Sequence, residues 1–72
     1  ILAGDDLIVY PNPVSDVLNI NKNVDLDVFD STGRLIISKT NTNVLDASLW
    51  TPGIYTLRIV WNNRTVIKKI IK

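Results

Sequence analysis

The chain has 72 residues and a net charge of +1, and 46% of its residues are hydrophobic. This length suits one small domain with a single core, and the hydrophobic content is too high for an intrinsically disordered chain. The sequence contains no Cys, His, Glu, Gln or Met, which excludes disulfides, the commonest zinc ligands and nucleophiles activated by His. We therefore expect no catalytic residue, no metal, no cofactor and no enzyme activity.

β-Branched residues dominate the composition, since Ile, Val and Thr make up a third of the chain. Such side chains fit a pleated, half-buried surface better than a helix, so the expected fold class is all-β. The longest apolar run, Leu7 to Tyr10, has four residues, whereas a membrane-spanning helix needs roughly 18. No secretion signal opens the chain, so any N-terminal export address is expected elsewhere.

Short apolar stretches separated by turn signals predict the strands in chain order. They cover residues 7–10, 16–20, 24–28, 34–39, 44–45, 54–61 and 64–72. In the third, alternation directs Val24, Leu26 and Val28 to the core and Asp25 and Asp27 to water. The strand 54–61 has one wholly apolar or aromatic face, made by Tyr55, Leu57, Ile59 and Trp61.

Turn residues separate these strands. Pro11-Asn12-Pro13 ends the first strand because proline fixes φ and lacks a backbone donor. Residues 30–33 predict a hairpin loop with Gly33 at positive φ, 46–49 predict a single helical turn, and Thr51-Pro52-Gly53 predicts a tight turn. Asn62-Asn63 tolerates the left-handed conformation of a two-residue hairpin.

The last strand does not alternate regularly, because Lys68 shares its parity with Val66 and Ile70 while Lys69 lies between two isoleucines. This predicts either a bulge near Lys68-Lys69 or a partly unpaired end. About seven short strands joined by tight turns predict a small immunoglobulin-like antiparallel β-sandwich, whose strand order the sequence does not give.

Charge is distributed unevenly along the chain. Residues 1–30 carry six Asp and one Lys, and residues 47–72 carry five Lys or Arg and no acid. Either the folded sheet brings the two ends together so that the charges cancel, or the basic end is used for recognition. Nucleic acid is not an expected partner, because the basic groups are few and an acidic half offsets them.

Three groups of residues have both a structural and a functional interpretation. The cluster Asp25, Asp27 and Asp30 fits a solvated strand face and turn better than a calcium site, since it lacks the EF-hand spacing. Four of the five aromatic residues would either pack the core or form a stacking platform for sugars, and they are Tyr10, Trp50, Tyr55 and Trp61. Lys68 to Lys72 would be either a charged edge protected against aggregation or a docking strand captured by strand addition.

Five segments occur in a distinctive order. They are Val9-Tyr10-Pro11-Asn12-Pro13, Leu18-Asn19-Ile20, Val28-Phe29-Asp30 with Gly33-Arg34-Leu35, Leu49 with Pro52-Gly53-Ile54-Tyr55, and Lys68-Lys69-Ile70-Ile71-Lys72. With these segments, residues 7–72 resemble the C-terminal sorting domain of type IX secretion cargo, the Por secretion tail. One small departure is Trp50-Thr51, where this family often has a small polar pair.

The resemblance implies an immunoglobulin-like β-sandwich that directs a fused N-terminal cargo domain through the type IX outer-membrane translocon. The cargo would cross the periplasm and meet an outer-membrane shuttle protein. At the cell surface a sortase would remove the domain, and the cargo would be released or attached to lipopolysaccharide. Residues 1–6 would be a linker remnant of the cargo, and a sandwich with exposed edges is open to weak homodimerisation.

Functional residues follow from the same resemblance. The expected translocon contacts are Lys68, Lys69, Ile70, Ile71 and Lys72, and deleting them is expected to impair export more than folding. The expected fold and turn determinants are Pro11, Asn12, Pro13, Gly33, Arg34, Pro52, Gly53 and Tyr55. The alternative functions are a carbohydrate-binding module and a purely structural immunoglobulin-like module of an extracellular protein.

Overall fold

A computed structural model describes residues 7–72, which form five antiparallel strands and no helix. The strands are β1 (Val9–Tyr10), β2 (Val17–Phe29), β3 (Leu35–Asp46), β4 (Ile54–Trp61) and β5 (Arg64–Ile71). The all-β prediction is thereby confirmed. No helix of the described part is long and apolar enough to cross a membrane. The linker predicted at residues 1–6 lies outside the described residues.

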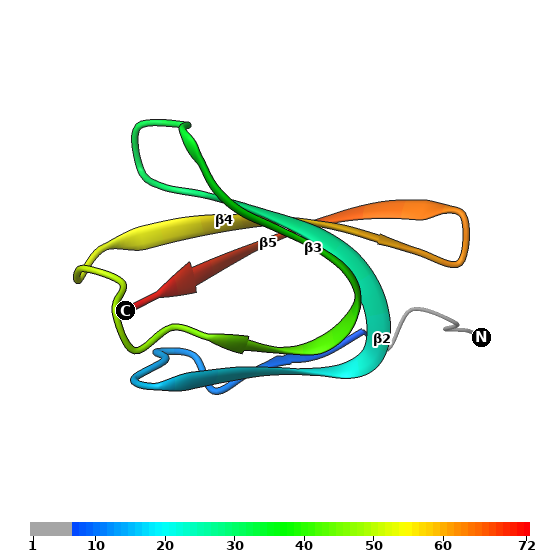
Figure 1. The fold of residues 1–72 in the computed structure, drawn as a ribbon, viewed down its shortest axis with the longest axis horizontal. Coiled ribbons are helices and arrows are strands. Elements are labelled where there is room, and N and C mark those ends of the chain that lie inside the picture. The colour runs from blue at the N-terminus through cyan, green and yellow to red at the C-terminus, as the bar shows by residue number, and fades with distance from the viewer. Residues whose placement is uncertain (1–6) are drawn as a thin grey trace.

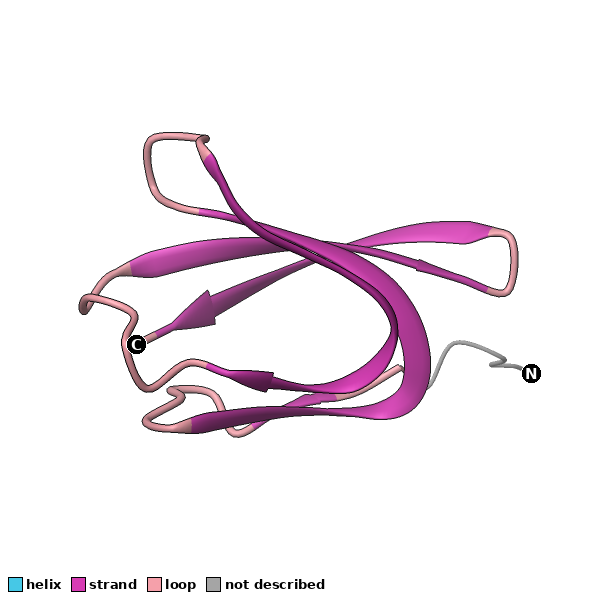
Figure 2. Ribbon diagram, viewed as in Figure 1, coloured by secondary structure: helices cyan, strands magenta, loops and turns pink. Residues whose placement is uncertain are grey.

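β2 is the central strand of a single sheet (Figure 2). β3 pairs with one of its edges from Val17 to Phe29. On the other edge β1 pairs near Ile20 and β4 pairs from Asp25 onward, so these two strands follow one another along β2. β5 pairs with the far side of β4. The last two strands therefore form a hairpin at the margin of the sheet.

The sheet curls over, so that its two halves face each other as two layers (Figure 1). Between the pairs Asn19–Val44 and Val24–Thr42, β2 advances five residues while β3 advances two. Surplus residues in one strand bend the pair and increase its twist. The prediction of about seven strands in two sheets is corrected to five strands in one curled sheet, because β2 and β3 each contain two of the predicted strands.

The polar segments around this bend continue the strands instead of ending them. Asn21 holds the segment before β1 beside β2 through two hydrogen bonds to Ile8. Its side-chain oxygen accepts a bond from the Ile8 N–H at 2.8 Å, and its own N–H donates to the Ile8 carbonyl at 3.1 Å. On β3, Asn41 takes a φ of 50° and its N–H donates to the Asp25 carboxylate at 2.8 Å. Side chains thus accept hydrogen bonds from backbone N–H groups at the bend, where the sequence pattern predicts connections between strands.

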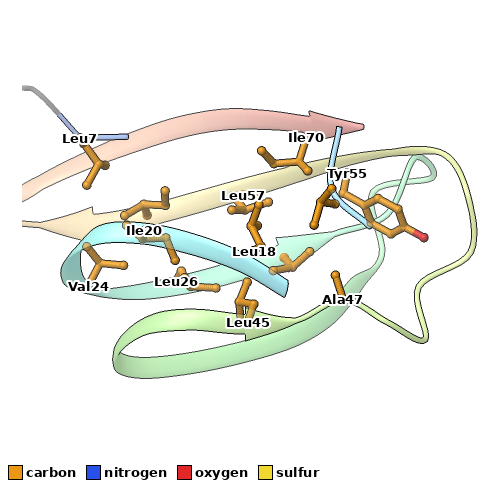
Figure 3. Packing of buried hydrophobic residues seen from close by; sticks show 13 residues of the cluster. Leu7, Leu18, Ile20, Val24, Leu26, Leu45, Ala47, Tyr55, Leu57 and Ile70 are labelled. Atoms are coloured by element: carbon orange, nitrogen blue, oxygen red, sulfur yellow. The ribbon is translucent and has the colours of Figure 1, made fainter. Parts of the chain in front are cut away.

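The core fills the space between the two layers (Figure 3). As predicted, Val24, Leu26 and Val28 are buried, and so are Tyr55, Leu57 and Ile59 on β4. The remaining buried residues come from both layers and the loops, and they are Leu7, Val14, Leu18, Ile20, Leu45, Ala47 and Ile70. Every strand but β1 contributes buried side chains to this small core, as expected for a domain of this size, in which few side chains can be buried.

The turns differ from prediction at one place. Asn62 and Asn63 have φ values of 53° and 61°, and Gly33 has a φ of 87°, so both predicted hairpins are confirmed. Residues 46–49 form no helical turn. Instead the Asp46 carboxylate accepts a bond from the Ser48 N–H at 3.0 Å, and the Trp50 N–H donates to the Ala47 carbonyl at 3.1 Å. A short aspartate side chain competes effectively with helix for such local donors.

Candidate recognition surface on the last strand

The last strand runs in regular register along β4, from Arg64 opposite Trp61 to Ile71 opposite Ile54. The predicted bulge near Lys68-Lys69 is wrong, as is the predicted unpaired end. Val66, Lys68 and Ile70 face the interior side, and Thr65, Ile67, Lys69 and Ile71 face outward and are exposed. The irregular pattern in the sequence reflects a lysine on the inner face and two isoleucines on the outer face.

The structure separates the five residues expected to contact a translocon. The Ile70 side chain is 1% exposed and belongs to the core. Lys68 is half-buried, and the Lys72 ammonium donates hydrogen bonds to the carbonyls of Ala47 and Ser48. Of the five residues, only Lys69 and Ile71 have exposed side chains. Because Ile70 and Lys72 contact the rest of the fold, deleting the segment is expected to impair folding as well as export.

The exposed pair lies within a larger surface on the outside of the β4–β5 hairpin. Ile54 lies opposite Ile71 on the neighbouring strand, and their side chains are 52% and 50% exposed. Ile67 is 56% exposed on the same face. We call Ile54, Ile67, Lys69 and Ile71 the outer hairpin surface. It combines an open apolar area with a positive charge, a composition typical of interaction sites.

Ile54 and Ile67 were missed as candidate site residues by sequence reasoning. A signal for Ile67 exists, since it shares its parity with Lys69 and Ile71. Ile54 alternates with the apolar face of its strand and therefore lies on the outer side. Its place beside Ile71 depends on the hairpin register, which is set by the two-residue turn at Asn62-Asn63.

The Pro11-Asn12-Pro13 segment is bound to the far end of β5. The Asn12 side chain donates to the Lys69 carbonyl at 3.2 Å and accepts from the Ile71 N–H at 3.0 Å. Just beyond it, the Val14 N–H donates to the Ile71 carbonyl at 2.8 Å. The asparagine amide thus imitates a neighbouring strand, and the prolines restrict the backbone that presents it.

The hairpin loop between β2 and β3 is organised by one carboxylate. Asp30 accepts hydrogen bonds from the Thr32 N–H, the Thr32 hydroxyl and the Arg34 N–H at 2.9, 2.6 and 3.0 Å. These bonds, the Thr32 hydroxyl first, hold the pKa of Asp30 below its ordinary value. Gly33 lies at the positive φ within this loop, and the Arg34 guanidinium reaches the carboxylate at 3.3 Å.

The turn before β4 ties the start of that strand to the end of β5. Gly53 and Lys72 exchange both backbone bonds, at 3.2 and 2.9 Å. The Tyr55 hydroxyl donates to the Thr51 carbonyl, and its ring lies 4.8 Å from that of Trp50. Pro52 and Gly53 form the bend between Thr51 and the strand. Through these contacts Gly53 and Tyr55 hold the turn against the end of β5, next to the outer hairpin surface.

The aromatic residues form no common platform for a sugar. Tyr55 is buried, and Trp50 packs against it. Trp61 is at the opposite end of β4, roughly 20 Å or more away along a strand of this length, and the Lys22 ammonium lies 5.2 Å from its ring centre. The described residues also enclose no pocket. Nothing in this arrangement favours the carbohydrate-binding alternative.

The acidic residues each have separate protein partners. Asp27 accepts bonds from the Ser38 hydroxyl at 2.7 Å and from the Arg58 guanidinium at 2.8 Å. Asp25 and Asp30 are engaged by β3 and by the hairpin loop. Within residues 7–72 no group of acidic side chains is arranged to hold a metal ion. The Asp27–Arg58 pair joins the acidic and basic parts of the chain, and it leaves the lysines of β5 without an acidic partner in the described residues.

Comparison with known proteins gives one informative result. The family model described as the secretion system C-terminal sorting domain matches residues 8–72. The matched range includes all five strands and the whole outer hairpin surface. No curated protein matches the chain.

Proposed function

The chain belongs to the family of secretion system C-terminal sorting domains, and from this membership we propose that it directs a fused N-terminal cargo through the type IX outer-membrane translocon. In this proposal the cargo crosses the periplasm, meets a shuttle protein at the outer membrane and reaches the cell surface or the medium. A surface sortase then removes the domain. The domain itself acts as a folded address and catalyses no reaction.

The observation that carries the proposal is the family match over residues 8–72. The outer hairpin surface supports it, since Ile54, Ile67 and Ile71 are half exposed beside the charged Lys69. A β-hairpin held by both backbone pairing and the core presents a fixed surface that a translocon component could bind in the folded domain.

The test fuses the 72-residue chain to the C-terminal end of a fluorescent reporter that carries its own periplasmic export signal. The fusion is expressed in a bacterium with a type IX system and in a strain that lacks the translocon. We expect the reporter at the cell surface or in the medium of the first strain only, and the cleaved reporter should lack the domain.

A matched pair of variants assigns the surface. Lys69→Asp reverses an exposed charge on β5, and Lys39→Asp makes the same change on β3, where Lys39 is also exposed. We expect the first to reduce surface delivery and the second to leave it near that of the unchanged fusion. If the unchanged fusion stayed folded and full-length in the periplasm of the competent strain, the sorting function would be refuted.

A further inference from the structure

The register of β5 on β4 shows which backbone N–H and C=O groups of β5 point toward β4 and which point away from it. Gly53 and Lys72 exchange both of their backbone bonds. Such pairs alternate along an antiparallel ladder, so the N–H and C=O groups of even-numbered residues in β5 point to β4. Those of Thr65, Ile67, Lys69 and Ile71 therefore point away from the sheet.

Part of this edge is already covered. Asn12 binds the Lys69 carbonyl and the Ile71 N–H, and the Val14 N–H binds the Ile71 carbonyl. β5 has no strand on this side within the described residues. Among residues 7–72, nothing pairs with the N–H and C=O groups of Thr65 and Ile67 or with the N–H of Lys69, and these groups have the geometry that a further strand requires.

The other long free edge of the sheet, on β3, is a poor template by comparison. Its pairing with β2 shifts register at three places, and Asn41 interrupts it with a positive φ. Bulges of this kind protect an edge against pairing. The pairing of β5 with β4 shows no shift, so its outer edge is regular.

Charge distinguishes between the strands that could occupy this edge. Lys68 and Lys69 have no ion-pair partner among residues 7–72. A second copy pairing here in the antiparallel sense would bring the lysines of both copies into one short stretch of sheet, and like charges across a strand pair are destabilising. An extended segment with acidic side chains would instead be complementary to this edge.

We propose that a partner protein of the export apparatus adds an extended, acidic segment to the open edge of β5 between Thr65 and Lys69. The partner's backbone would pair with the outward groups of Thr65 and Ile67, and its carboxylates would lie near Lys69. The inference rests on the proposed sorting function and specifies how the same surface is bound. Strand addition of this kind derives affinity from main-chain bonds and selectivity from alternate side chains.

The experiment compares Ile67→Pro with Ile67→Ala in the reporter fusion. Proline removes the outward N–H and sterically blocks an added strand, while it spares the bonds to β4, since proline is tolerated on the solvent side of an edge strand. Alanine removes the same exposed side chain and keeps the backbone donor. We expect Ile67→Pro to lower surface delivery about tenfold or more and Ile67→Ala to lower it by less than about threefold.

Folding is checked by thermal unfolding of each purified variant. If Ile67→Pro does not fold, Thr65→Pro replaces it, because the Thr65 N–H also points outward. If neither proline variant folds, the comparison of Lys69→Asp with Lys39→Asp decides, and equal delivery by these two would overturn the proposal.

Each outcome is informative. Equal loss for Ile67→Pro and Ile67→Ala means that side chains alone are read, by a protein groove or a lipid surface, and overturns strand addition. Delivery of Ile67→Pro at the unchanged level also overturns it and leaves the sorting function intact. A failure of the unchanged fusion to reach the surface refutes the sorting function and this inference together.

Discussion

Ile70 and Ile71 are neighbours of the same type with opposite environments, because consecutive side chains of a strand point to opposite faces. Ile70 is 1% exposed in the core, and Ile71 is 50% exposed on the outer hairpin surface. Ile70→Ala is therefore expected to lower the free energy of unfolding by about 2–4 kcal/mol. Ile71→Ala should change it by less than about 0.5 kcal/mol. Chemical denaturation of both variants measures the difference.

In the export assay, when only folded protein is counted, Ile71→Asp is expected to impair delivery more than Ile70→Ala does. Ile71→Asp places a charge on the outer hairpin surface without entering the core, and it should impair delivery while the unfolding midpoint stays close to that of the unchanged domain. Comparable loss of stability for Ile70→Ala and Ile71→Ala would contradict the burial of Ile70 and the exposure of Ile71.

Asn12 is a short polar residue that restrains the distant end of β5. Asn12→Ala removes the bonds to Lys69 and Ile71, and it is expected to lower the free energy of unfolding by about 1 kcal/mol, as typical for exposed hydrogen bonds. The amide of Ile71 should exchange its hydrogen faster. Asn43→Ala on the exposed part of β3 is the control and should leave that amide unchanged.

Asp27 links stability to pH. Its pKa lies below the ordinary value of 3.8 because the Ser38 hydroxyl, first, and the Arg58 guanidinium donate hydrogen bonds to the carboxylate. A carboxyl whose pKa is lowered by folding stabilises the folded state above the ordinary pKa, and this contribution is lost as the pH falls through the lowered pKa.

Asp27→Asn should therefore be less stable than the unchanged domain near neutral pH. The difference should shrink once the pH falls below 3.8, where the native carboxyl is also becoming neutral. Thermal unfolding at a series of pH values measures it, and Asp16→Asn, at an exposed residue, serves as the control. A stability difference that grows toward acid would contradict the pKa direction.

β5 makes a prediction as an element, through the alternation of its backbone bonds. The amides of Val66, Lys68 and Ile70 should exchange slowly, since they point to β4, and those of Thr65, Ile67 and Lys69 should exchange quickly. Amide exchange followed by nuclear magnetic resonance provides the test. A bulge at Lys68-Lys69, as the sequence alone suggests, would reverse the alternation after Lys68, so that different amides beyond it would exchange slowly.

The strands that sequence reasoning predicted best are those whose pattern is local. β4 was predicted with its bounds and faces, because one of its faces is wholly apolar or aromatic, the other includes Thr56 and Arg58, and a strong turn signal flanks each end. β2 was predicted as two strands, because Asn21, Lys22 and Asn23 look like a connection. Their hydrogen bonds come from residues far away in the chain, such as Ile8, and no local pattern indicates such a partner.

The whole molecule depends on its last residues. Removing Lys68 to Lys72 takes Ile70 from the core, ends the pairing with the first residues of β4, and deletes the bonds of Lys72 to Gly53, Ala47 and Ser48. We expect the truncated chain to lose its cooperative unfolding transition, because a domain of this size has only about 3–5 kcal/mol in reserve. A full-length Lys69→Thr variant should retain the transition, and a cooperative transition in the truncated chain would show that the end of β5 is dispensable for folding.

The sequence by itself determined the all-β class, the positions of the hairpin turns, the inner faces of β2 and β4 and the family. These depend on local alternation, on residues that permit special backbone angles, and on ordered segments along the chain. Only the tertiary structure decided that two long strands bend into facing layers and that Ile70 is buried while Ile71 is exposed. It also decided that Asn12 covers one end of the β5 edge, while the other end has no neighbouring strand within residues 7–72. Strand pairing and curvature join residues distant in sequence, and their energy depends on partners that a local pattern does not specify.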